Sequence, residues 1–114
     1  MAVLSVQNTS LAGSVLTTAA AAGGGDSFAA GPDENYFLQV TNGGGGSINV
    51  IINDPNTASP AGATAFNPDV TVAVAASATK TIKLASPRRF IDTTTGRIDI
   101  AYSSATSVTV AVFK

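Results

Sequence analysis

The most constraining feature of this sequence is an alternation of apolar with polar or small residues that repeats with a period of two. Successive side chains of a β-strand point to opposite faces, so the alternation gives each segment one apolar and one polar face. It predicts half-buried strands of antiparallel sheets, whereas no segment repeats with helical spacing. The alternation occurs in residues 69–74 (DVTVAV), 79–84 (TKTIKL), 97–102 (RIDIAY) and 107–113 (SVTVAVF).

Two further segments are apolar on both faces. They are 36–40 (YFLQV) and 48–52 (INVII), and this pattern predicts strands that lie centrally in a sheet or contact a partner. The N-terminal segments 2–7 (AVLSVQ) and 14–22 (SVLTTAAAA) are weaker strand candidates, because alanine is a poor strand former.

Turn residues separate these segments. Asn53 to Pro68 holds three prolines and forms the longest loop. Short strands with turns about every 8–12 residues are typical of sandwiches and small barrels. We therefore predict one all-β domain, a compact antiparallel β-sandwich or jelly-roll-like barrel of about seven to nine short strands. Residues 1–31 are expected to form an arm or weak strands with a Gly/Ala-rich loop, and residues 32–114 the sandwich.

Four consecutive glycines, Gly43 to Gly46, invite comparison with a phosphate-binding loop. Such a loop needs a lysine and a hydroxyl residue after the last glycine, at the start of a helix. Here SINVII follows, which is a strand pattern without a lysine. Asn42-Gly43 between two strands is instead a hairpin signal, since both residues accept positive φ. The sequence predicts a hairpin turn.

The chain is poor in charge. Only 11% of its residues are charged, with six basic, seven acidic and a net charge of −1, whereas about 25% is typical. A surface of Ala, Ser, Thr, Asn and Gly suits a protein that packs against others, although a monomer made soluble by hydroxyls fits too. The largest basic cluster is Arg88-Arg89, so nucleic-acid binding is not expected.

Reactive residue types are scarce. The sequence has no cysteine and no histidine, which removes thiolate metal sites and the commonest general base. Asp26, Asp33 and Glu34 lack the ligand spacing of a calcium loop and are expected to be solvated. Nothing in the spacing pairs Glu34, Asp92 or Asp99 as a glycosidase would need. We expect neither an enzyme nor a cofactor.

No secretory signal is recognisable at the N-terminus, and no apolar run approaches the ~20 residues of a membrane-spanning helix. The expectation is a protein that stays in the cytoplasm where it is made, with no membrane partner. A secreted chain whose signal had been removed would show the same pattern.

Residues that could contact a partner are few. Arg88 and Arg89 follow a proline and are expected in an extended or turn segment. Their guanidinium groups could bind carboxylates or carbonyls of a partner, or the pair could be solvated beside Asp92. The seven aromatic residues are too dispersed to indicate a carbohydrate-stacking platform and are expected to be core or strand-end anchors.

The order of three segments resembles small virion structural proteins of tailed bacteriophages. Those proteins share a GD-F-N-G-xx-FLxVxNGG block, then xVTVPAG, then GxVxVTYSxVTxVTVAV. The best matches here are FLQVTNGGG and RIDIAYSSATSVTVAV. The sequence departs from the pattern where AASAT replaces the PAG turn and in the proline-rich loop 54–68. Both departures fall in loops, where partner contacts would lie.

The resemblance implies a capsid decoration, or cement, protein with a compact β fold. On this expectation the chain is assembled in the host cytoplasm, binds the major capsid protein on the outer surface of the virion and stabilises the shell, often as a homotrimer. The alternatives are a tail or fibre component, and a secreted carbohydrate-binding or adhesin module. The candidate partner contacts are Val3, Leu4, Phe66, Arg88 and Arg89.

Overall fold

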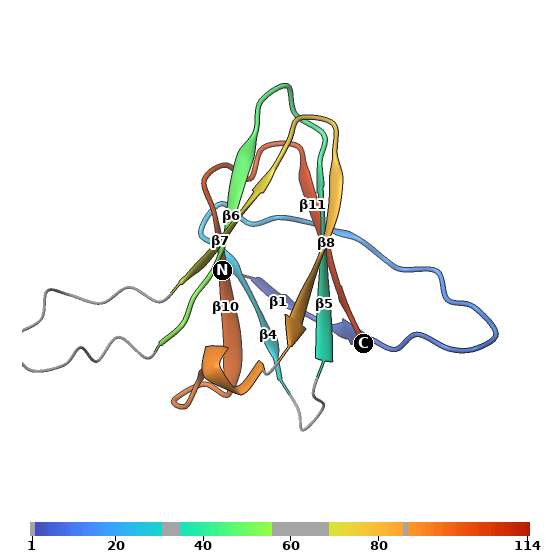
Figure 1. Ribbon diagram of the computed structural model, residues 1–114, viewed down its shortest axis with the longest axis vertical. Helices are drawn as coiled ribbons and strands as arrows, with labels where there is room; N and C mark the ends of the chain where they lie inside the picture. The colour runs from blue at the N-terminus through green and yellow to red at the C-terminus, as the bar shows by residue number, and fades with distance from the viewer. Residues whose placement is uncertain (1, 31–34, 56–68, 86) are drawn as a thin grey trace, which may run out of the picture.

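A computed structural model describes residues 2–30, 35–55, 69–85 and 87–114 (Figure 1). Within them the chain is all-β, with eleven strands and one short 3-10 helix, η1 (Pro87–Phe90). The strands form two sheets that face each other, which confirms the predicted sandwich. The strand number exceeds seven to nine because three of the strands are two-residue segments that add to the sheet edges or to β10.

The first sheet has the strand order β1-β4-β10-β6-β7, and β9 also pairs with β10. β6 lies inside this sheet, as its two apolar faces predicted. The strands are β1 (Ala2–Leu4), β4 (Asp26–Ala29), β6 (Ile48–Ile52), β7 (Val70–Val74), β9 (Ile91–Asp92) and β10 (Arg97–Tyr102).

The second sheet has the order β2-β11-β5-β8, with β3 also on β11. β5 lies between β11 and β8, which again agrees with its apolar pattern, and it pairs with β11 over six positions from Phe37↔Phe113 to Asn42↔Val108. The strands are β2 (Val6–Gln7), β3 (Ala19–Ala20), β5 (Asn35–Asn42), β8 (Thr79–Ala85) and β11 (Val108–Phe113).

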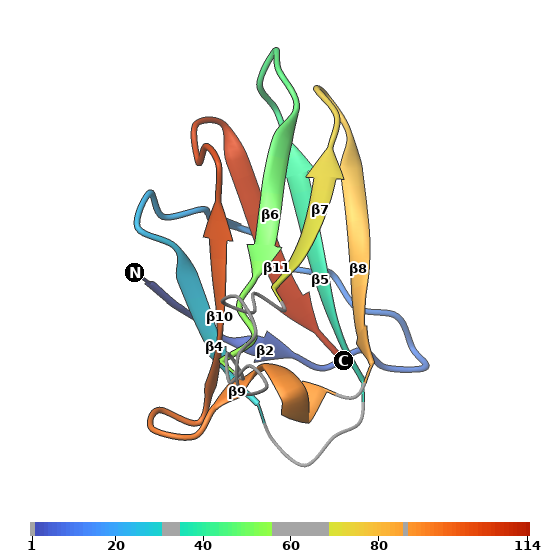
Figure 2. The same cartoon turned by 60° about the vertical axis from the view of Figure 1, so that its left-hand side comes forward.

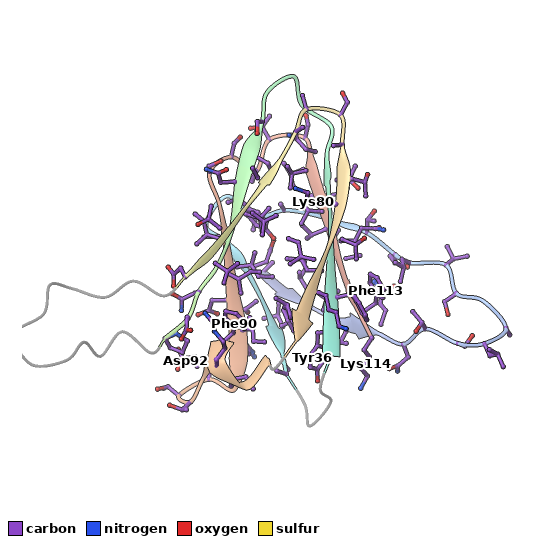
Figure 3. The ribbon with its side chains drawn as sticks, in the orientation of Figure 1. Tyr36, Lys80, Phe90, Asp92, Phe113 and Lys114 are labelled. Atoms are coloured by element: carbon purple, nitrogen blue, oxygen red, sulfur yellow. The ribbon has the colours of Figure 1, made fainter. Side chains whose placement is uncertain are left out.

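The core fills the space between the sheets (Figure 3). It consists of the apolar faces that the alternation predicted, and the rings of Phe28 and Tyr36 meet in it with centroids 5.7 Å apart. At one side of the sandwich, Lys80 Nζ reaches from β8 across to β7 and donates to the carbonyl of Ala73 at 2.8 Å. The largest fully buried side chains include Phe28, Tyr36, Leu38, Ile52, Ile98, Ile100 and Val110.

The glycine run does not form the predicted hairpin. β5 and β6 belong to different sheets, so residues 43–47 carry the chain from one sheet to the other. The connections 75–78 and 103–107 do the same, and all three gather at one end of the molecule (Figure 1, top). The hairpin prediction was wrong because Asn-Gly favours a tight bend without specifying whether the next strand pairs with the last.

The N-terminal segment contributes to both sheets. β1 runs parallel to β4 in the first sheet, and β2 runs parallel to β11 in the second. The chain therefore changes sheets at Ser5, opposite the side that Lys80 spans (Figure 2). These two parallel pairs make the sheets mixed, a departure from the expected antiparallel arrangement.

Candidate functional site: an apolar groove and the loop beside it

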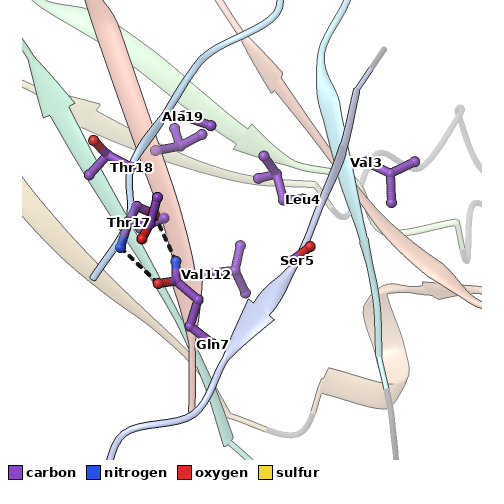
Figure 4. A pocket seen from close by; sticks show the side chains of 10 residues that line it. Val3, Leu4, Ser5, Gln7, Thr17, Thr18, Ala19 and Val112 are labelled. Carbon is purple, nitrogen blue, oxygen red and sulfur yellow. Dashed lines mark hydrogen bonds between the residues drawn. The ribbon is translucent and has the colours of Figure 1, made fainter. Parts of the chain in front are cut away.

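A groove runs along β11, at the edge where the N-terminal segment joins the second sheet (Figure 4). Its volume is about 410 Å³. We call it the N-terminal groove. Most of its lining is aliphatic or small, and none is charged: Val3, Leu4, Ser5, Gln7, Thr17, Thr18, Ala19, Val110, Ala111 and Val112. Chemically, it can accommodate an apolar side chain.

The groove exists because two short strands share one edge of β11. β3 pairs with Thr109 and Val110, whereas β2 pairs with Val112 and Phe113. The Gln7 side chain joins the two segments: its Nε2 donates to the Thr17 carbonyl, and its Oε1 accepts from the Thr17 amide, both at 2.8 Å. The carboxamide thus pairs with the Thr17 backbone through two hydrogen bonds, as a peptide unit of a neighbouring strand would.

Residues 8–16 leave the sheet beyond this bridge and project from the molecule (Figures 1 and 2). We call them the N-terminal loop. Its base is fixed where the Thr9 amide and hydroxyl both donate to the Lys114 carbonyl. Its tip is a turn with a Gly13 N–H to Ser10 O bond of 3.0 Å, and Gly13 has a φ of 95°, which glycine adopts readily. Leu11 and Val15 are fully exposed on it.

The predicted partner contacts fall in different surroundings. Val3 is 58% exposed at the outer strand β1, and Leu4 beside it is buried and lines the groove. Arg88 lies in η1. Phe66 lies outside the described residues. The structure thus brings Val3 and Leu4 together at the N-terminal groove, away from the arginines.

Arg89 makes an ion pair within the chain. Its Nε lies 3.0 Å from Oδ2 of Asp54, whose side chain is 5% exposed, and its guanidinium carbon lies 4.6 Å from the Phe90 ring centre. The Asp54 amide in turn donates to Asp69 Oδ1 at 2.8 Å. Sequence analysis left open a partner contact or a solvated pair beside Asp92 for the two arginines. The observed ion pair joins η1 to Asp54, and through the Asp54 amide to Asp69.

Asp26 is buried, contrary to its prediction as a solvated loop acid. The Tyr102 hydroxyl donates to its Oδ2 at 2.8 Å, and the Ala22 amide donates to the same oxygen at 3.2 Å. Oδ1 has no hydrogen-bond partner among the described residues. Burial, and next the Asp26 carboxylate, raise the pKa of the Tyr102 hydroxyl well above its ordinary value. Asp26 and Tyr102 come together because β4 pairs with β10. The local sequence around Asp26 did not indicate this pairing.

Asn42 organises the end of the sandwich that carries the glycine run. Its side chain is buried, and Nδ2 lies within hydrogen-bonding distance of the carbonyls of Gly46, Val74 and Ala75 at 2.8, 3.2 and 3.3 Å. The Gly43 amide donates to Ser107 O, and the Gly44 amide donates to Asn42 Oδ1. These bonds occupy the amides of Gly43 and Gly44, so neither of the two is free to hold a phosphate.

A pair of phenylalanines lies on the outer face of the second sheet, where sequence reasoning saw only dispersed aromatics. Phe37 and Phe113 are stacked, with ring centres 5.2 Å apart and planes at 18°, and Phe113 points away from the first sheet (Figure 3). The alternation does place each phenylalanine on the face opposite the core residues of its strand. The register that pairs them could not be read from the sequence.

The described residues contain no group of three or more acidic residues placed to hold a metal ion. A search of the same residues finds no helix with the length and apolar character of a membrane span. Comparison with protein-family models, with curated proteins and with solved structures found no match.

Proposed function

We propose that this chain is a non-enzymatic bacteriophage capsid decoration protein that binds the major capsid protein on the outside of the shell. The proposal joins the resemblance of FLQVTNGGG and RIDIAYSSATSVTVAV to the position of those segments. They form β5, β10 and β11, which lie inside the two sheets. The shared pattern therefore covers three interior strands of the sandwich.

The observation that carries the proposal is the nearly uncharged outer face of the second sheet, which we call the outer face. Its three cross-strand rows are Phe113–Phe37–Lys83, Ala111–Gln39–Thr81 and Thr109–Thr41–Thr79, and Lys83 is the only charged residue in them. The corresponding face of the first sheet carries Arg97 and Asp99. Apart from Lys83, this face can be buried against a partner without desolvating a charged side chain.

Binding of this kind stabilises a shell by mass action. A decoration protein that contacts neighbouring capsid subunits adds contacts that exist only in the assembled state, so it favours the closed shell. Rigidity helps, since a preformed face has little ordering entropy to lose on binding. The expected location is the virion surface, and the expected homotrimer would multiply the weak contacts of single faces.

Copy number in purified particles tests the proposal directly. We expect of order one chain for each capsid chain, or one trimer for each capsomer junction, by quantitative mass spectrometry. A few copies per particle would assign the chain to the tail or fibre instead. Absence from particles would reject both virion functions.

A pair of charge variants tests the outer face itself. Thr81→Glu with Thr109→Glu should reduce capsid affinity at least about tenfold, because two carboxylates would be desolvated in the contact. Thr71→Glu with Ala101→Glu places the same charges on the outside of the first sheet and is the matched control. Equal occupancy of the two variants would show that the shell contacts another surface.

The stacked phenylalanines favour one second candidate, a carbohydrate-binding module. Aromatic faces stack on sugars, and Gln39 lies in the row next to the Phe37–Phe113 pair and could donate to a hydroxyl. A glycan panel probed with the wild-type chain and with Phe113→Ala tests this alternative. Binding that is lost in the variant would support it.

A further inference from the structure

We propose that copies of this chain associate head to tail, with the N-terminal loop of one copy placing Leu11 and Val15 in the N-terminal groove of the next. The inference concerns the free protein and does not rest on capsid binding. It starts from two features of a single molecule: exposed apolar side chains on the N-terminal loop, and an apolar groove that the same chain leaves open. Among the described residues, the large apolar side chains that are exposed are Val3, Leu11 and Val15. Leu11 and Val15 lie on the loop, and Val3 lies at the groove.

The loop cannot fill the groove of its own chain. Thr17 and Thr18, which follow the loop, form part of the groove wall, and the Gln7 bridge holds Thr17 in place. From this fixed base the loop extends away from the two sheets (Figures 1 and 2). The Gln7–Thr17 bridge and the Thr9–Lys114 bonds hold both ends of the loop in this outward direction. The natural occupant is therefore the same loop of another copy.

Both surfaces have the same chemical character. Residues 2–25 contain no charged residue, so the contact desolvates no ion on either side. The groove offers Leu4, Val110 and Val112 to the incoming aliphatic side chains. Its volume of about 410 Å³ lies in the range of sites that enclose small apolar groups.

The geometry fixes the type of assembly. Loop and groove are different surfaces, so the contact is heterologous, and each copy retains one free loop and one free groove until a ring closes. A twofold dimer with identical patches facing each other is not expected. Association should continue with concentration to a closed ring or an open chain.

Three variants test the contact by sedimentation velocity over a range of concentrations. Leu11→Ser with Val15→Ser removes the inserted side chains and should weaken self-association at least about 100-fold, from the loss of two buried aliphatic groups. Ser5→Trp fills the groove, with Thr18→Trp as a second choice should the first fail to fold. Thr93→Trp, on the exposed turn after β9, is the matched control and should associate like wild type.

Mixing the variants gives the sharpest readout. The loop variant keeps an intact groove, and the groove variant keeps an intact loop. Each alone should stay monomeric, whereas an equimolar mixture should form one-to-one dimers and nothing larger. Mixed dimers would be evidence for a head-to-tail contact, since a symmetric interface would be damaged in both partners.

Any of three results would overturn the inference. The first is a wild-type chain that remains monomeric, with a dissociation constant for self-association above about 1 mM. The second is a loop variant that associates as strongly as wild type, and the third is a mixture of the two variants that forms no dimers. Capsid occupancy of the same variants separates this contact from the proposed function. Variants that no longer self-associate but still occupy the shell would leave both proposals standing. A wild-type chain that self-associates but does not occupy the shell would reject only the proposed function.

Discussion

Two regions of this sandwich differ in how far their polar groups are hydrogen-bonded and their apolar groups are buried. The first is the end where three connections cross between the sheets, which we call the crossover end; there the buried Asn42 bonds to two of the three connections. The second is the edge of the second sheet that carries the N-terminal groove and loop, which we call the N-terminal edge; there Gln7 bridges to Thr17, but Leu11, Val15 and Val3 remain exposed. The first region has completed its contacts within one chain, whereas the second has not.

The difference indicates a division between stability and binding. Buried groups that bond only within the chain specify a unique fold, because any loss leaves an unpaired group in the interior. Exposed aliphatic side chains contribute little to the stability of the monomer, and they contribute to the stability of a complex when a partner buries them. Substitutions at the crossover end should therefore change unfolding, and substitutions at the N-terminal loop should change association.

The largest effect is expected at Asn42. Asn42→Ala removes the donor to Gly46, Val74 and Ala75 and leaves carbonyls at the end of the core without it. The free energy of unfolding should fall by about 2–4 kcal/mol. Urea denaturation followed by fluorescence or circular dichroism measures it. Asn49→Ala, at an exposed site on β6, is the control and should change stability by less than about 0.5 kcal/mol. Equal losses would show that Asn42 has no special role.

Tyr102 should give the next largest effect, together with a pH dependence. Tyr102→Phe deprives Asp26 of its 2.8 Å donor and should lower the unfolding free energy by about 1–3 kcal/mol at neutral pH. Because the pKa of this hydroxyl is raised in the folded state, the unfolded state loses its proton first as pH rises.

The sign of the pH effect follows from that order. The contribution of Tyr102 is complete below its ordinary pKa of about 10 and decreases above it, by up to about 1.4 kcal/mol per pH unit. Denaturation midpoints from pH 8 upward should therefore fall less steeply for Tyr102→Phe than for wild type. Parallel curves for the two proteins would contradict the raised pKa.

The sequence predicted the sandwich because strand periodicity is a local signal. Ile98 and Ile100, or Val108 and Val110, sit on one face whatever their strands pair with, so the core could be read directly. The sequence did not show which strands pair with each other. Asn42-Gly43 looks the same whether the next strand pairs with the last or crosses to the other sheet, and the structure has the second arrangement.

The candidate site was predictable only in part, for the same reason. Val3 and Leu4 were selected from an apolar arm, and they lie at the N-terminal groove. The groove itself depends on β2 and β3 sharing one edge of β11, a long-range pairing between residues about a hundred positions apart. Likewise, Asp26 gave no local sign that β10 would bring Tyr102 to it.

A smaller effect is expected at Gln7. Gln7→Ala removes both 2.8 Å hydrogen bonds to Thr17. The free energy of unfolding should fall by about 1 kcal/mol or less, because the bridge is near the surface. Its clearer result is local: hydrogen exchange at the Thr17 amide should accelerate while core amides stay protected. Gln7→Glu keeps an acceptor for that amide and should give intermediate exchange. Unchanged exchange in both variants would show that the strands alone hold the loop.

The smallest effect on folding is expected at the loop tip, where the effect on association is large. Leu11→Ser with Val15→Ser should leave the unfolding free energy of the monomer within about 0.5 kcal/mol of wild type, because neither side chain is buried. The measurement is urea denaturation at a concentration low enough for wild type to be monomeric. At higher concentration the wild-type midpoint should rise, since association stabilises the folded state by mass action, and the variant should not follow. A concentration-independent wild type would place the N-terminal edge in the same class as the crossover end and remove the contrast between them.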